Sequence, residues 1–260
     1  PLDKNNRILV RQGILRIKAG QVCPGITALL RIAGRDPGQL KASDLGFTVG
    51  PRLNSAGRID DMSVGIACLL ASDVNSATEI AKTLDSLNKE RRTIETKMKE
   101  DAFKAIDLLD LDKKLPYGLC VYEPSWHQGV VGLVAARVKE KTQRPVIAFA
   151  KVSDGSLKGS ARSIPKIHIR NILESIATQH PTLISKFGGH AMAAGLSLQA
   201  SDYEAFQAAF AHEIEKHMTP ADLKHEHITD GELSEEELTL PTAELLRDAG
   251  PFGQGFLEPL

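Results

Sequence analysis

Four short segments of the chain combine arginine, lysine, histidine or hydroxyl groups with small residues, a mixture that suits phosphate binding. They are GPRLNSAGR at 50–58, SWHQGVVG at 125–132, KGSARS at 158–163 and GGHAMAAG at 188–195. A guanidinium fork matches the geometry of a phosphate, and glycine lets a backbone or a ligand come close. These segments are therefore the candidate sites.

The segment at 50–58 places Arg52, Asn54 and Arg58 within a turn-rich stretch, which we expect to be an ordered loop. Two arginines beside glycines suit a phosphate ligand. They would equally well tie the loop down through carboxylates such as Asp60 or Asp61. The residues alone leave both interpretations open.

The segment at 125–132 lies where a predicted strand gives way to a predicted helix. A helix N-terminus offers free N–H groups and a partial positive charge, so His127 at this point suits a phosphate or a base. The plainer interpretation is that Trp126 fills the core at a strand end and His127 acts as a cap. Taken alone, the segment favours the plainer interpretation.

The segment at 158–163 reads as a polar strand, in which alternation sends Lys158, Ser160 and Arg162 to one face. Two cations and a hydroxyl group on one face fit a phosphate site better than a core. The alternative is an exposed edge strand that charge protects from unwanted pairing.

The segment at 188–195 places His190 among small residues inside a pattern that otherwise reads as a strand. Glycine in a strand often marks the close approach of a ligand or of another backbone. Gly188 and Gly189 would admit a nucleotide, and His190 would donate to an anionic oxygen. Tight internal packing explains the segment as well, and without the other segments it is the preferred interpretation.

The composition is that of a globular protein with room for substantial cores: 260 residues, 42% hydrophobic and 25% charged. No apolar run is long enough to cross a membrane, and three scattered cysteines favour a reducing cytoplasm. Residues 219–260 hold ten acidic and two basic residues, whereas residues 1–218 hold 23 acidic and 30 basic, a net charge of +7. A basic body permits a polyanionic partner.

The positioning elements change character along the chain. The first hundred residues read as helical, and a long uninterrupted helix is expected over 75–109, spanning about 50 Å. Strand and helix patterns then alternate, which predicts a compact α/β or α+β domain over 110–218. Strands are expected at 117–124, 145–152, 156–164 and 186–198, and helices at 130–141, 167–180 and 202–218.

Taken together, the four segments, LNKERRTIE at 87–95 and GPFGQGFLEP at 250–259 resemble the RecJ family of the DHH phosphoesterase superfamily. The motifs follow the family's order and span essentially the whole chain. One departure is Phe256-Leu257, where the family often has Asn-Pro.

This resemblance implies a mixed α/β fold in four parts: the end of a DHH domain (1–74), a connecting helix (75–109), a DHHA1 domain with a mixed sheet (110–218) and the start of an OB fold (219–260). The family's metal ligands would precede residue 1. The resemblance therefore implies no catalytic and no metal-binding residue in this chain, which is expected to be inactive alone. Mn²⁺ or Mg²⁺ would belong to the full-length enzyme.

The implied activity is 5′→3′ exonuclease action on single-stranded DNA in repair and recombination. By resemblance, Ser160, Arg162 and Ser163 would anchor the 5′-phosphate. Gly188, Gly189 and His190 would contact the backbone near the scissile bond, and Arg52 would hold a phosphate near the metals. The remaining predicted DNA-binding residues are Asn54, Arg58, His127 and Lys158.

Two other functions compete with this one: a DHH-family oligoribonuclease or nucleotide phosphatase, and a non-catalytic nucleic-acid-binding module. The segment at 50–58 and the OB-like segment after 218 argue against the phosphatase. Expected partners are single-stranded DNA with a 5′ end, a helicase and a single-strand-binding protein. The whole enzyme is expected to be a cytoplasmic monomer without membrane association.

Overall fold

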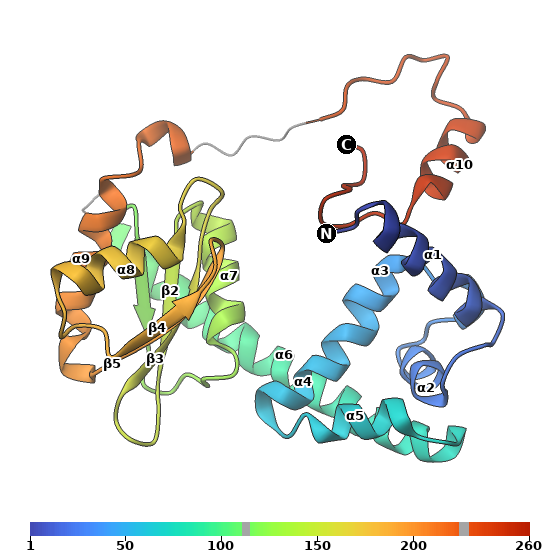
Figure 1. Cartoon of the computed structure of the whole chain (residues 1–260), viewed down its shortest axis with the longest axis horizontal. Helices are drawn as coiled ribbons and strands as arrows, with labels where there is room; N and C mark the ends of the chain where they lie inside the picture. The colour runs from blue at the N-terminus through green and yellow to red at the C-terminus, as the bar shows by residue number, and fades with distance from the viewer. Residues whose placement is uncertain (111–114, 224–228) are drawn as a thin grey trace. The chain divides into compact units, whose positions relative to one another are not determined.

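The computed structural model describes residues 1–110, 115–223 and 229–260 (Figure 1). The chain has a mixed α/β fold and divides into two compact units. One unit comprises Pro1–Glu90 with Glu226–Leu260, and the other comprises Arg91–His225. Their boundary falls inside the long helix α6 (Val74–Asp110), which confirms the helix predicted over 75–109. The boundaries of the four predicted parts stay predictions.

The first unit is helical and surrounds a small apolar core. The core includes Leu29, Leu30, Ala56 and Leu84. The helices of this unit are α1 (Lys4–Lys18), α2 (Pro24–Ile32), η1 (Pro37–Gln39), α3 (Ala42–Asp44), η2 (Leu45–Val49), α4 (Gly50–Ile59), α5 (Ser63–Leu70), the start of α6, and α10 (Leu240–Ala249).

The prediction of an ordered loop for the turn-rich stretch around 50–58, which runs over 43–61, is wrong, because this stretch forms the π-helix η2 and the α-helix α4. Pro51 occupies the first turn of α4, where its missing N–H costs nothing. The glycines lower the local helix propensity, but α4 presents Arg52 and Ser55 to polar partners on α6. Tertiary contacts thus override the local turn signal.

The last described residues fold back onto helix α1. The Arg7 Nη2 atom donates to the Ala249 carbonyl oxygen at 2.8 Å, and the Arg7 guanidinium lies 3.6 Å from the centroid of the Phe256 ring. Phe252 and Phe256 stack at 5.4 Å between ring centroids. Within residues 229–260, α10 is the one described helix. The start of an OB fold there stays a prediction.

The second unit is built on a five-stranded mixed sheet with the order β1-β2-β3-β5-β4. The strands β1 and β2 are parallel, and the other neighbours are antiparallel. The strands are β1 (Leu119–Tyr122), β2 (Val146–Lys151), β3 (Leu157–Arg162), β4 (Lys186–Gly189) and β5 (Ala193–Leu198). The mixed sheet is confirmed, while the strand pattern at 186–198 proves to be a hairpin of two strands.

Helices cover both faces of this sheet (Figure 1). Helix α7 (Val131–Thr142) lies over β2 and β3, whereas α8 (Ile169–Gln179) and α9 (Tyr203–Glu215) cover the other face. Phe149 of β2 is fully buried on the α9 side, where it meets Phe206 edge to face. The short helices η3 (Ala200–Asp202) and η4 (Pro220–Leu223) flank α9.

A buried carboxylate joins α8 to α9. Glu213 accepts hydrogen bonds from the Ser175 hydroxyl at 2.7 Å, the Gln179 amide at 3.2 Å and the Lys216 ammonium group at 2.6 Å. The Lys216 bond is the main cause that lowers the Glu213 pKa to about 2, against a smaller opposing effect of burial.

Candidate nucleic-acid interface

The strand β3 carries the predicted phosphate-binding face. Residues Leu157, Gly159 and Ala161 are buried, while Lys158 is exposed and Ser160 and Arg162 are half-buried. This alternation places Lys158, Ser160 and Arg162 on the same side of the sheet, as their spacing predicts.

The sheet register carries this face across two further strands. Ser160 lies opposite Gly195 of β5, and Gly195 lies opposite Gly188 of β4. Directly paired residues share a face, so the hydroxyl of Ser160 borders a floor of two glycines. Lys158 lies opposite Ser197, which in turn lies opposite Lys186. The segments at 158–163 and 188–195 thus form one continuous surface.

Packing inside the protein explains the neighbouring Gly189 but neither of the two glycines in this floor. At Gly189 the backbone has a φ of +147°, and an added Cβ would lie 2.5 Å from the Ala193 carbonyl oxygen. At Gly188 a Cβ would meet no atom of the described residues within 4 Å, and at Gly195 the nearest atom is 3.9 Å away. Gly189 is therefore structural, while Gly188 and Gly195 keep a surface open.

The segment at 125–132 reaches the same surface through Gly132, in the first turn of α7. A Cβ at Gly132 would lie 2.9 Å from the Arg162 Nη2 atom and 2.9 Å from the Ser160 Oγ atom. The Arg162 Nη1 atom donates to the Ser160 hydroxyl at 3.1 Å and to the Ala161 carbonyl at 2.8 Å. Arginine, serine and the start of α7 are thus brought together.

The two histidines lie in exposed turns. His190 sits between β4 and β5, with its backbone N–H donating to the Ala193 carbonyl. His127 accepts the Gly129 N–H at its Nδ1 atom at 3.1 Å, so a neutral ring carries its proton on Nε2. Trp126 is 5% exposed, as the core interpretation predicts, and its indole N–H lacks a hydrogen-bond partner in the described structure.

Ser163 does not join this surface. It is 1% exposed, and its hydroxyl donates to the Ile167 carbonyl at 2.6 Å. Its backbone N–H donates to the Met192 carbonyl, so Ser163 ties the end of β3 to the turn before β5. A direct phosphate contact by its side chain would require an exposed hydroxyl, which this geometry does not provide.

The three candidates at 50–58 lie in the helical unit, on α4. The Nε and Nη2 atoms of Arg52 bind the Asp85 carboxylate at 2.8 and 2.7 Å, and its Nη1 atom donates to the Thr48 carbonyl at 2.9 Å. Arg52 thus fastens α4 to α6, and its carboxylate partner is Asp85, not Asp60 or Asp61, which the second interpretation of the sequence had suggested.

Two opposing influences act on the pKa of the Asp85 carboxyl group. Burial acts to raise the pKa of Asp85, but the hydrogen bonds and charges of Lys89 and Arg52 outweigh burial and hold the pKa below its ordinary value. Asn54 is exposed and Arg58 is half-buried one turn further along α4.

The described residues hold no group of three or more His, Cys, Asp or Glu side chains that would suit a metal ion. Two-metal phosphodiester chemistry needs such a group. The described residues therefore do not offer a ligand set that fits Mn²⁺ or Mg²⁺. That this chain binds no metal stays a prediction.

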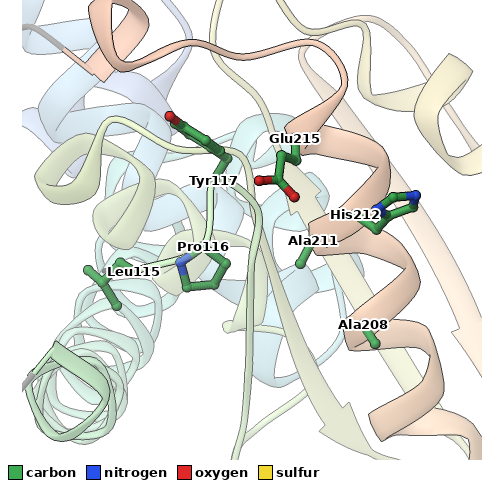
Figure 2. A pocket seen from close by; sticks show the side chains of 7 residues that line it. All are labelled: Leu115, Pro116, Tyr117, Ala208, Ala211, His212 and Glu215. Atoms are coloured by element: carbon green, nitrogen blue, oxygen red, sulfur yellow. The ribbon is translucent and has the colours of Figure 1, made fainter. Parts of the chain in front are cut away.

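A separate hollow of about 450 Å³ lies between α9 and the segment at 115–117 (Figure 2). Glu215 projects into it from α9, His212 of the same helix also lines it, and Tyr117 lies on the facing segment. None of the predicted site residues lines this hollow. Its carboxylate would repel a phosphate, so the hollow does not belong to the interface on β3, β5 and β4.

The sequence analysis missed two residues of the candidate interface, Lys186 and Gly132. The alternation that selected Lys158, Ser160 and Arg162 also places Lys186 on the face of Gly188, so the same signal finds it. The part played by Gly132 depends on how α7 packs on β3, which no local pattern reveals.

Comparison with known proteins identifies the family of the chain and the domain that contains this sheet. Residues 115–216 match the family model of the DHHA1 domain. The single-stranded-DNA-specific exonuclease RecJ of Salmonella typhimurium is 54% identical over 261 residues, covering 100% of this chain and 45% of that protein. The chain therefore spans less than half the length of this relative.

Solved RecJ structures share the fold. RecJ of Thermus thermophilus in complex with Mg²⁺ is 30% identical with a TM-score of 0.84, covering 100% of this chain and 39% of that one. The same enzyme with Mn²⁺ gives a TM-score of 0.82, covering 98% and 36%. The chain belongs to the RecJ family, and residues 115–216 are its DHHA1 domain.

Proposed function

We propose that the surface formed by β3, β5 and β4 binds the 5′ end of single-stranded DNA, within a whole protein that acts as a 5′→3′ exonuclease. Relatives named single-stranded-DNA-specific exonuclease RecJ support this substrate and this reaction. The carrying observation is the open glycine floor at Gly188 and Gly195, bordered by the hydroxyl of Ser160 and the guanidinium of Arg162.

The floor and its border suit different parts of a nucleotide. Glycines leave space for a sugar–phosphate backbone to lie against the sheet, because a bound strand meets no side chain there. The guanidinium of Arg162 offers N–H groups in the fork geometry that a terminal phosphate prefers. Lys158 and Lys186, which precede Ser160 and Gly188 by two residues in their strands, add positive charge for the following phosphates.

The N-terminus of α7 adds hydrogen-bond donors beside Arg162 and Ser160. The first N–H groups of a helix have no partner inside the helix and carry partial positive charge. In α7 no side chain caps these groups. A phosphate beside Arg162 and Ser160 would therefore also face the favourable end of a helix.

Hydrolysis itself is proposed for the whole protein, with Mn²⁺ or Mg²⁺. Both ions occur in RecJ structures of Thermus thermophilus, which supports this assignment. We propose that the present chain binds DNA without cleaving it, since its described residues contain no suitable ligand group. Metal-dependent cleavage by a highly purified sample would contradict this.

The direct test is fluorescence anisotropy with a short oligothymidylate labelled at its 3′ end, carrying either a 5′-phosphate or a 5′-hydroxyl, across a salt series. Tighter binding of the phosphorylated strand, weakening steeply with salt, is the expected result. Equal binding of the two strands at every salt concentration would exclude the end-binding site.

A purely binding role is the second candidate, favoured by the lack of a metal-ligand group among the described residues. The whole protein separates the two: hydrolysis that requires added Mn²⁺ or Mg²⁺ indicates the nuclease, and its absence indicates a binding module. A nucleotide phosphatase would instead prefer the shortest strands in the same assay.

For the whole protein we further propose a cytoplasmic monomer that works beside a helicase and a single-strand-binding protein. Three free cysteines support a reducing compartment. None of the described helices combines the length and the apolar character that crossing a bilayer requires.

A further inference from the structure

We propose that Gly132 is a positioning residue for 5′-phosphate recognition: by lacking a side chain, it sets the place of the Arg162 guanidinium and the Ser160 hydroxyl. This inference rests on the proposed end-binding function of those two residues. It assigns a role to the last glycine of SWHQGVVG, a segment in which only His127 had been a candidate.

A side chain at position 132 would collide with both Arg162 and Ser160. A Cβ at Gly132 would lie 2.9 Å from both Arg162 Nη2 and Ser160 Oγ, with the next atom, Arg162 Cζ, at 3.7 Å. Separations of 2.9 Å are shorter than a carbon atom tolerates from a nitrogen or oxygen atom. The two close atoms are the ends of rotatable side chains, so a methyl group would displace them while the backbone stays in place.

Backbone conformation gives no other reason for glycine at this position. Gly132 is not among the glycines of the described chain with positive φ, and it lies within the first turn of α7. Glycine inside a helix is about 1 kcal/mol less favourable than alanine. On helix propensity alone an alanine would be preferred, so the packing of Arg162 and Ser160 is the remaining cause.

The position of the guanidinium matters because two hydrogen bonds already fix its other side. The Nη1 atom donates to the Ala161 carbonyl and to the Ser160 hydroxyl, which directs Nη2 toward the start of α7. A phosphate bound there would meet Nη2 and the first N–H groups of the helix together. A methyl group at position 132 would occupy the space between these two sets of donors.

The test is a double-mutant cycle of Gly132→Ala and Arg162→Ala, measured in the 260-residue chain. The readout is the ratio of the dissociation constants for 5′-hydroxyl and 5′-phosphorylated oligothymidylate. Gly132→Ala is expected to lower this ratio about tenfold, the size of one displaced charge-assisted hydrogen bond, and to change the affinity for the hydroxyl strand less than about twofold. In the Arg162→Ala background it should have no further effect.

Gly13→Ala is the matched control. Gly13 lies within helix α1, has no positive φ, and a Cβ there meets no described atom within 4 Å. This variant makes the same chemical change in a helix and should retain the wild-type ratio. Circular dichroism and thermal unfolding of each variant show whether the fold is kept.

Each outcome decides the matter. If the wild-type chain lacks a 5′-phosphate preference, the proposed function fails and this inference fails with it. If the preference exists and Gly132→Ala retains it, or weakens both strands equally, the positioning role alone is overturned. Should Gly132→Ala fail to fold, refolding of the Gly132→Ala/Arg162→Ala double variant would place the clash at Arg162. An unfolded double variant would overturn the positioning of Arg162 by Gly132, because the damage would then arise at Ser160 or in the backbone of α7.

Discussion

Gly188 and Gly195 lie directly opposite each other on β4 and β5, and internal packing does not require glycine at either position. Their neighbour Gly189, by contrast, has a backbone conformation and a packing contact that demand glycine. The backbone and packing of the protein require glycine at position 189, whereas at position 188 only a bound ligand would require it. Substitutions at the two positions should therefore have different effects.

Gly188→Val is expected to weaken binding of single-stranded DNA about tenfold or more, because the branched side chain would fill the floor. Stability should be unchanged or slightly higher, since valine favours strands. Gly189→Ala should instead lower the free energy of unfolding by about 2 kcal/mol through backbone strain. Urea unfolding and anisotropy separate the two effects, and a Gly188→Val variant with wild-type affinity would show that the floor does not hold DNA.

Arg162→Ala and Lys158→Ala should weaken DNA binding in different ways. Losing the guanidinium removes the preference for a 5′-phosphate, whereas losing Lys158 weakens all strands alike. For Lys158→Ala the slope of log K against log salt should become shallower by about 0.7, the value for one phosphate contact on a single strand. An equal loss for phosphorylated and hydroxyl strands in Arg162→Ala would contradict the end-anchoring role.

Arg52→Ala is expected to destabilise the helical unit by about 2–3 kcal/mol, because it removes a half-buried partner from the Asp85 carboxylate. The 5′-phosphate preference should stay at its wild-type value. Chemical unfolding followed by helix content, together with anisotropy, checks both parts. A stable variant that binds DNA poorly would instead support the phosphate contact that the sequence pattern suggested for Arg52.

The Glu213 carboxylate predicts a specific acid sensitivity. Its pKa is lowered from an ordinary 4.5 to about 2, so its ionised form contributes stability above pH 4.5 that is lost as the pH falls toward 2. Glu213→Gln removes the charge that faces Lys216 and His217 and should lower stability by about 1–2 kcal/mol at neutral pH.

Thermal unfolding between pH 2 and pH 7 tests this prediction. The wild-type midpoint should fall more steeply than that of Glu213→Gln within the pH window from 4.5 to 2. Parallel curves for the two proteins across that window would assign the acid sensitivity to other groups.

Local periodicity was enough to predict most of the elements. The alternation at 157–162 placed Lys158, Ser160 and Arg162 on one face, and the uninterrupted apolar spacing over 75–109 predicted α6 to within a residue at each end. Both are short-range signals, because they depend on the repeat of a single strand or helix.

Features that depend on contacts between distant segments escaped this reasoning. The helix α4 exists where turn residues predicted a loop, since Arg52 binds Asp85 33 residues away. The hairpin turn after Gly189 contains His190, Ala191 and Met192, which give no turn signal of their own. The burial of Ser163 likewise follows from the packing of the next loop, to which its hydroxyl donates.

The return of the last segment to α1 has a consequence for synthesis on the ribosome. Arg7 finds its carbonyl partner 242 residues later, whereas Arg91–His225 is one continuous stretch of chain. At about 5–20 residues per second, roughly 12–50 s separate the emergence of α1 from that of its partner. The sheet-containing unit is complete before the helical unit can close, so Arg7 stays without its Ala249 partner until that residue has been synthesised.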